Sequence, residues 1–253
     1  MRAARGAVPA KATSKSDNRC RVQPGSTRGG FDRRDNSRRM GVEAIIWDFG
    51  GVFTTSPFEA FNRYEAQRGL PRDFIRMVNS TNHESNAWAQ FECSAIDASE
   101  FDRRFLAEST TLGHSVRGAD ILPLLSGDFR PRMLAALKLC KEHFKVGCIT
   151  NNVVHGQGPG MSVTAAGASH AAEIMLLFDA IVESSKTGIR KPNPKIYLMM
   201  CELLGVEPNA CIYLDDLGIN CKPAAQLGMR AIKVVSEEQT LNDLASATGL
   251  TFA

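Results

Sequence analysis

Four short clusters of polar residues follow apolar runs of this chain, and together they could handle a phosphate group. The first is Asp48, which closes the apolar run 44–47 and precedes the pair Gly50-Gly51. The other three are Thr150-Asn151-Asn152, Arg190-Lys191-Pro192 and Asp215-Asp216. They supply hydroxyl and amide donors, a fixed cation, and paired carboxylates able to hold a hard divalent metal ion. A carboxylate held where a buried strand opens into a glycine turn is placed to act as a nucleophile.

The apolar runs before these clusters predict buried strands, at residues 42–48, 145–150, 179–183, 211–215 and 230–235. Helical patterns alternate with the later strands, at residues 131–143, 169–176, 194–205, 219–227 and from Ser236 onward. Repeated strand–helix units of this length predict an α/β fold with a doubly wound parallel sheet and right-handed crossovers. In such a sheet the ligand crevice lies beyond the carboxyl ends of the strands, so we expect the four clusters to meet there.

The residues between the first two predicted strands show only helical patterns. Ser56, Pro57 and Glu59 predict a helix start with a capping box. Further helices are expected at residues 71–79, 88–92, 99–112 and 119–125. We therefore expect an all-α cap at residues 56–128, inserted into an α/β core formed by residues 41–55 and 129–253. The glycine-rich residues 152–167 are expected to form a long loop.

Residues 1–40 differ from the rest in composition. They carry eleven Lys or Arg against three Asp and few large apolar residues, so we expect a disordered basic leader. A misassigned start, with translation beginning at Met40, is the alternative to a targeting leader. Residues 41–253 carry nineteen Lys or Arg against twenty-four Asp or Glu, so the net charge of +3 comes from the leader. Nucleic-acid binding would require clustered basic residues on the folded part, so we expect no such partner.

The remaining composition is that of an ordinary globular protein. A chain of 253 residues with 43% apolar and 23% charged residues can bury a large core. No stretch approaches the roughly 20 apolar residues that cross a bilayer, so we expect no membrane association. The seven cysteines are odd in number and lack C-x-x-C spacing, which predicts free thiols in a reducing, cytoplasmic compartment. The oligomeric state stays open between a monomer and a homodimer.

The four clusters, in this order, resemble the motifs of the haloacid dehalogenase superfamily of aspartate-dependent hydrolases. The matching segments are residues 48–52, 149–151, 188–197, and 213–216 together with Asn220. The resemblance covers essentially residues 43–250. It points to the helical-cap branch that includes the N-terminal phosphatase domain of soluble epoxide hydrolase. It implies a Rossmann-like core, a helical cap and hydrolysis of a phosphoric monoester of a small metabolite.

Carried over residue by residue, the resemblance also implies a Mg²⁺ site. Asp48 would be both a metal ligand and the nucleophile that forms an aspartyl-phosphate. Gly50 would contribute its backbone carbonyl to the metal. Asp216 would be a direct carboxylate ligand, and Asp215 a direct or water-mediated one.

The resemblance assigns the remaining motif residues to the phosphate. Thr150 and Asn151 would donate hydrogen bonds to the phosphoryl oxygens. Lys191 would screen the repulsion between the anionic nucleophile and the anionic substrate. Substrate choice is expected to belong to the cap, where polar and aromatic residues cluster: Asn82, His83, Asn86, Trp88 and Phe91.

Position 50 departs from the pattern of the superfamily. Most of its phosphatases carry a second aspartate there as general acid, worth about 10² to 10⁴ in rate, whereas this chain has Gly50. Three interpretations stay open. In the first, the protein is a phosphatase that favours good leaving groups or takes an acid from the cap, where His83, Glu84 and His114 are candidates. In the second, it binds a phosphorylated ligand without turnover. In the third, it is a 2-haloacid dehalogenase, although the pair Asp215-Asp216 argues against this.

Overall fold

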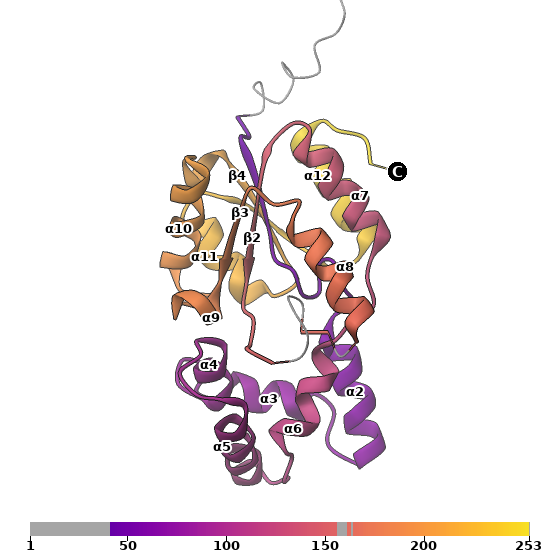
Figure 1. Cartoon of the computed structure of the whole chain (residues 1–253), viewed down its shortest axis with the longest axis vertical. Coiled ribbons are helices and arrows are strands. Elements are labelled where there is room, and N and C mark those ends of the chain that lie inside the picture. The colour runs from indigo at the N-terminus through magenta and orange to yellow at the C-terminus, as the bar shows by residue number, and fades with distance from the viewer. Residues whose placement is uncertain (1–40, 156–160, 163, 253) are drawn as a thin grey trace, which may run out of the picture. The chain divides into compact units, whose positions relative to one another are not determined.

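The computed structural model describes residues 41–155, 161–162 and 164–252, so the predicted leader lies outside the described residues. Five strands form one parallel sheet in the order β3-β2-β1-β4-β5 (Figure 1). Their bounds are β1 Ala44–Trp47, β2 Lys145–Thr150, β3 Ala180–Glu183, β4 Cys211–Asp215 and β5 Arg230–Lys233. The central strand β1 pairs with both β2 and β4, so that Ala44 lies opposite Lys145 and Cys211. The predicted α/β fold with a parallel sheet is confirmed.

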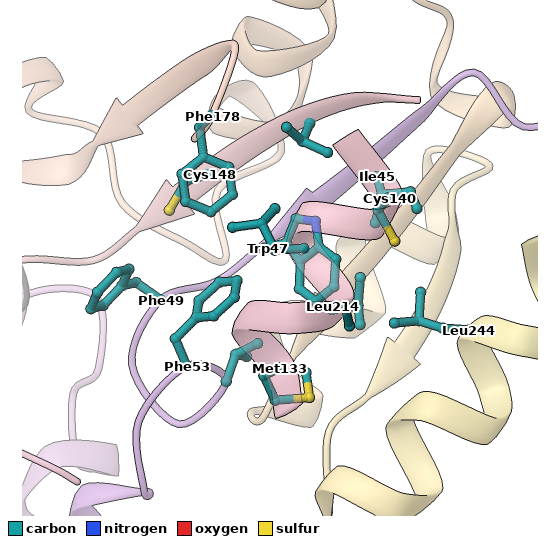
Figure 2. Close-up of a cluster of buried hydrophobic side chains, with 14 of the residues drawn as sticks. Ile45, Trp47, Phe49, Phe53, Met133, Cys140, Cys148, Phe178, Leu214 and Leu244 are labelled. Atoms are coloured by element: carbon teal, nitrogen blue, oxygen red, sulfur yellow. The ribbon is translucent and has the colours of Figure 1, made fainter. Parts of the chain in front are cut away.

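Helices cover both faces of this sheet because alternate side chains of a strand point to opposite faces. Ile45 and Trp47 of β1 pack with helices α7 (Pro131–Lys141), α8 (Ala165–Met175) and α12 (Glu237–Thr248), in the cluster shown in Figure 2. Ala44 and Ile46 pack on the other face with α10 (Pro194–Leu204) and α11 (Gly218–Gln226). Every residue of β1 is therefore buried, which fixes the position of Asp48 immediately after it.

The chain between β1 and α7 forms helices, as predicted. Its elements are α2 Pro57–Arg68, α3 Phe74–Ser80, α4 Ala87–Glu92, α5 Ala98–Thr111, α6 Gly118–Ile121 and the 3₁₀ turn η1 Leu122–Leu125. We call residues 57–125 the helical segment. It has its own apolar cluster, which includes Phe74, Phe91 and Phe101. The division of the chain into a cap domain and a core domain stays a prediction.

Two local predictions were wrong, and two short helices were missed. Helix α8 begins at Ala165, where the Thr164 side chain caps it, so the end of the predicted loop 152–167 is helical. The short helices α9 (Ser184–Thr187) and η2 (Pro208–Ala210) were not predicted, because three or four residues carry no periodic signal. The capping box at Ser56 does not form, and its hydroxyl donates a hydrogen bond to Asp216 instead.

Two further expectations concern cysteines and membranes. Six cysteines fall within the described residues, and all six are free thiols. The described part of the chain contains no helix that combines the length and the apolar character needed to span a bilayer.

Candidate active site

The four polar clusters meet at the carboxyl end of the sheet, as expected. Asp48 follows β1, Thr150 ends β2, Asp215 ends β4, and Lys191 lies between α9 and α10. A cavity of about 450 Å³ opens here. Its wall includes six of the seven predicted site residues: Asp48, Gly50, Thr150, Asn151, Lys191 and Asp216. The seventh, Asp215, is fully buried and reaches the cavity through Lys191.

Lys191 forms the centre of the site. Its Nζ atom lies 2.8 Å from Oδ1 of Asp48 and 2.8 Å from Oδ2 of Asp215. Burial lowers the pKa of Lys191, but the charges of Asp215 and Asp48 outweigh it and raise the pKa above its usual value. Lys191 therefore stays an ammonium ion although its side chain is only 1% exposed.

A network of hydrogen bonds holds Asp215. Its carboxylate accepts hydrogen bonds from the Tyr213 hydroxyl, from Nδ2 of Asn220 and from the backbone N–H of Leu217, besides the contact with Lys191. Burial raises the pKa of Tyr213 well above its usual value, so this hydroxyl remains a donor. Tyr213 was not among the predicted site residues. Its position two residues before Asp215 on β4 could have revealed it, because residues i and i+2 of a strand share a face.

Three carboxylates crowd the site. One oxygen each from Asp48, Asp215 and Asp216 lies within 4.8 Å of the others. Burial raises the pKa of Asp48 against the opposing charge of Lys191, and the charges of Asp215 and Asp216 raise it further. Burial and then the charge of Asp215 raise the pKa of Asp216 to about 6. Three acidic groups facing one lysine thus leave an excess of negative charge, which a divalent cation would neutralise.

The residues present fit a hard divalent cation such as Mg²⁺, because they offer only oxygen ligands. Asp48, Gly50 and Asp216 line the cavity. Gly51 makes room for Asp216: its φ is +74°, and a Cβ at this position would lie 2.2 Å from Oδ2 of Asp216. The Ser56 hydroxyl donates a 3.1 Å hydrogen bond to the same oxygen. Asp216 is therefore held at the cavity wall, where its carboxylate can serve as a metal ligand.

The Asn151 side chain is engaged with the loop that carries Lys191. Its Oδ1 accepts a 2.8 Å hydrogen bond from the backbone N–H of Lys191, and its Nδ2 donates to the carbonyl of Lys191 at 3.0 Å. The same Nδ2 also donates to Glu92 at 3.3 Å. Thr150 is buried beside it at the end of β2. The loops after β2 and before α10 are thereby joined directly at the cavity.

Position 50 is open. Beyond its chain neighbours, no atom of the described residues lies within 4 Å of the point where a Cβ of residue 50 would stand. Of the three candidate acids, His83 lines the cavity, whereas Glu84 and His114 are not part of its described wall. The His114 ring packs instead edge-on against Phe74, with 5.0 Å between ring centroids.

Most of the wall away from the sheet is apolar. It is formed by Phe58, Phe61, Trp88 and Leu125 of the helical segment, with Val153 and Leu217. Arg76 adds a cation to this wall and lies 4.2 Å from the centroid of the Phe58 ring. Some of the residues expected to choose the substrate line the cavity, and others do not. Trp88 and His83 reach the cavity, Phe91 packs in the apolar cluster of the helical segment, and Asn86 caps α4.

Sequence reasoning missed an ion pair that crosses from the helical segment to the sheet end. Nε of Arg190 lies 2.5 Å from Oε2 of Glu92, the last residue of α4, and both residues line the cavity. The residues are 98 positions apart in the chain. No local pattern connects them, although the position of Arg190 directly before Lys191 was a signal that it would reach the site.

Comparisons with known proteins agree with this geometry. A family model described as haloacid dehalogenase-like hydrolase matches residues 42–228. Bifunctional epoxide hydrolase 2 of Mus musculus is 29% identical over 225 residues, which make up 84% of this chain and 40% of that protein. The chain therefore spans about 40% of the length of this relative. Phosphatase MT3486 of Mycobacterium tuberculosis is 30% identical over 212 residues, 79% of this chain and 91% of that protein.

A solved structure shares the fold. It is the haloacid dehalogenase family enzyme BT-2542 of Bacteroides thetaiotaomicron, in complex with magnesium and inorganic phosphate. The TM-score is 0.50 with 19% sequence identity, and the match covers 76% of this chain and 93% of that chain.

Proposed function

Because the chain belongs to the haloacid dehalogenase-like hydrolases, we propose that it is a magnesium-dependent phosphatase of a small phosphorylated metabolite. The observation that carries this proposal is the position of Lys191 between Asp48 and Asp215, at a cavity that Asp216 also lines. A carboxylate nucleophile, a buried cation and a further carboxylate are the parts that phosphoryl transfer to an aspartate requires.

In the proposed reaction, a carboxylate oxygen of Asp48 attacks the phosphorus atom. A bond forms between this oxygen and phosphorus, while the bond from phosphorus to the leaving oxygen breaks and its electron pair goes to that oxygen. Water then cleaves the aspartyl-phosphate, which releases inorganic phosphate and restores the Asp48 carboxylate.

Lys191 supports this step electrostatically. Two unit charges of like sign about 4 Å apart repel each other by about 4 kcal/mol at an effective dielectric constant near 20. The Lys191 ammonium, held 2.8 Å from Oδ1 of Asp48, offsets that repulsion between nucleophile and substrate. We propose that Asp48, Asp216 and the carbonyl of Gly50 hold Mg²⁺, with Asp215 behind them in direct or water-mediated contact. When bound, Mg²⁺ neutralises charge on the phosphoryl oxygens.

We assign phosphate binding to Thr150 and Asn151. The Thr150 hydroxyl lies at the cavity end of β2 and can donate to a phosphoryl oxygen. The amide of Asn151 already contacts Lys191 and Glu92, so Asn151 would use its backbone N–H for the phosphate.

The cavity wall supports a substrate whose organic part is apolar or aromatic. Phe58, Phe61 and Trp88 would contact that part while the phosphate lies at the sheet end. Gly50 limits the leaving group, because it offers no side chain to protonate the departing oxygen. Good leaving groups such as phenolates therefore suit this site better than alkoxides, unless His83 supplies the proton.

Gly50 also favours a second candidate function, a protein that binds a phosphorylated ligand without turnover. The dehalogenase alternative is weaker, because three clustered carboxylates would repel a haloacid carboxylate. The acidic balance of residues 41–253 supports the further proposal that the protein has no nucleic-acid partner. We also propose a cytoplasmic location, which the free cysteines support, and a monomer or homodimer without membrane partners.

The test is phosphate release from an aryl phosphate by purified protein with Mg²⁺, with a chelator, and with the Asp48→Asn variant. We expect release with Mg²⁺, and loss of it in the other two cases. Binding of beryllofluoride without release from any of a panel of phosphates would favour the non-catalytic function. Chloride release from 2-chloropropionate in chelator would favour the dehalogenase.

A further inference from the structure

Glu92 connects the helical segment to the phosphate end of the cavity. Its buried carboxylate accepts three hydrogen bonds: from Nε of Arg190 at 2.5 Å, from Nε1 of Trp88 at 2.9 Å and from Nδ2 of Asn151 at 3.3 Å. Its backbone carbonyl accepts a fourth, from the Ser184 hydroxyl at 2.7 Å. One residue of α4 thus contacts the loop after β2, helix α9 and the loop before α10.

These contacts continue to the proposed nucleophile. Asn151, which Glu92 holds, exchanges two hydrogen bonds with the backbone of Lys191. Lys191 in turn contacts Asp48. A continuous path therefore runs from Trp88 on the apolar wall, through Glu92 and Asn151, to the cation beside Asp48.

Arg190 holds the same region from the side of the sheet. Besides its ion pair with Glu92, its Nη1 donates a 2.9 Å hydrogen bond to the carbonyl of His83. The guanidinium therefore binds two separate parts of the helical segment, α4 and the turn before it. A buried carboxylate that receives an arginine and two further donors is well satisfied, and such a network rigidifies its surroundings.

We propose that Glu92 is a positioning residue for the phosphate site: through Asn151 it fixes the backbone of Lys191, and with Arg190 it ties that geometry to the cavity wall contributed by the helical segment. This inference rests on the proposed function, because it concerns the same phosphate site. Glu92 acts through Asn151 and is not assigned any contact with the substrate.

The variant Glu92→Gln tests this role. Three donors converge on two carboxylate oxygens, and an amide offers one acceptor oxygen and places an N–H₂ group against a donor. We expect the affinity for inorganic phosphate with Mg²⁺, measured by titration calorimetry, to fall about tenfold, as replacement of outer partners of a site does. We expect kcat/KM for an aryl phosphate to fall about tenfold to a hundredfold, because small displacements of reacting groups are costly.

Glu108→Gln is the matched control. Its carboxylate also belongs to the helical segment and accepts a 2.8 Å hydrogen bond from the N–H of Ala87 at the start of α4, away from the described cavity wall. If Glu92 only stabilised the helical segment, both variants would lower the thermal midpoint and leave phosphate affinity unchanged. That result would overturn the proposal.

A second variant tests the same role if Glu92→Gln does not fold. Glu92→Asp keeps the charge opposite Arg190 but is one methylene shorter, so it cannot reach Arg190, Asn151 and Trp88 together, and we expect an intermediate loss of phosphate affinity. Unchanged affinity in this variant would also refute the inference. If the wild-type protein binds phosphate but releases none from any ester, only the proposed turnover fails. If it binds no phosphate at all, the site and the role of Glu92 both fail.

Discussion

Replacement of Asp216 by asparagine should stabilise the metal-free protein while it removes activity. Burial and the charge of Asp215 raise the pKa of Asp216 from its usual 3.8 to about 6. An acid whose pKa is higher in the folded state binds its proton more tightly there. Ionisation of Asp216 therefore lowers the free energy of unfolding. This loss is absent at low pH, grows as the pH rises from 3.8 to about 6, and stays constant above that range. A pKa difference of this size corresponds to on the order of 3 kcal/mol.

Asp216→Asn removes this cost, because the amide cannot ionise and its oxygen can still accept the hydrogen bond of Ser56. Urea unfolding in chelator should show a gain of up to about 3 kcal/mol near pH 8 and about half of that near pH 5. Added Mg²⁺ should raise the free energy of unfolding of the wild-type protein by RT ln(1 + [Mg²⁺]/Kd), and raise that of the variant much less. Phosphate release by the variant should be lost.

Asp128→Asn is the control, because Asp128 is exposed and lies outside the described cavity wall. It should leave both the stability and its pH dependence unchanged. If Asp216→Asn were less stable than the wild type in chelator at both pH values, the charge of Asp216 would not destabilise the metal-free protein.

Four further predictions concern the same cavity. Gly51→Ala should abolish Mg²⁺-dependent stabilisation in thermal unfolding, because its Cβ would lie 2.2 Å from the Asp216 carboxylate, whereas Gly50→Ala should be tolerated. Gly50→Asp should speed hydrolysis of alkyl phosphates, by at most about 10² to 10⁴, because the added carboxyl group meets open space and can protonate the leaving oxygen; equal rates for both proteins would contradict this. His83→Gln should slow steady-state hydrolysis of alkyl phosphates more than that of aryl phosphates, and equal slowing would exclude His83 as the acid. Lys191→Met should abolish phosphate release. In urea unfolding near neutral pH it should lower the free energy of unfolding by about 3 to 5 kcal/mol, and by less at low pH, where the carboxylates are protonated. A variant as stable as the wild type would show that the buried ion pairs of Lys191 do not stabilise the fold.

Much of the fold could be predicted from the sequence because its signals are local. The apolar run 44–47 has no polar interruption, so it predicts a strand buried on both faces, and β1 is the fully buried centre of the sheet. Asn193 and Pro194 predict the start of α10, and the Asn193 side chain caps it as expected. The boundaries of elements were predicted less accurately where the local sequence fits both a loop and a helix. Glycine-rich residues near 165 suggested a loop, but α8 forms there, because the Thr164 side chain caps its start and Ala171 and Ile174 of the same helix pack in the core.

Most of the predicted site residues were found because they lie at the carboxyl ends of strands of one parallel sheet. Parallel strands bring their carboxyl ends to one edge, so Asp48, Thr150 and Asp215 meet without any further information. Lys191 was placed by its motif and not by a strand. Among the residues that were missed, Tyr213 shares a strand face with Asp215, so the period of the strand could have revealed it. The contacts of Glu92 and Ser56 with residues far along the chain follow from no local pattern.

The sequence by itself determined which elements form, their order in the chain, and the residue types that stand at the sheet end. Only the tertiary structure decided how those side chains pair: that Lys191 bridges two carboxylates, that Ser56 reaches Asp216 across 160 positions, and that Glu92 binds Arg190 across 98. The physical reason is that a strand or helix follows from periodicity among near neighbours. A hydrogen bond between distant residues depends instead on how whole elements pack, and on which donors that packing leaves within reach of a buried acceptor.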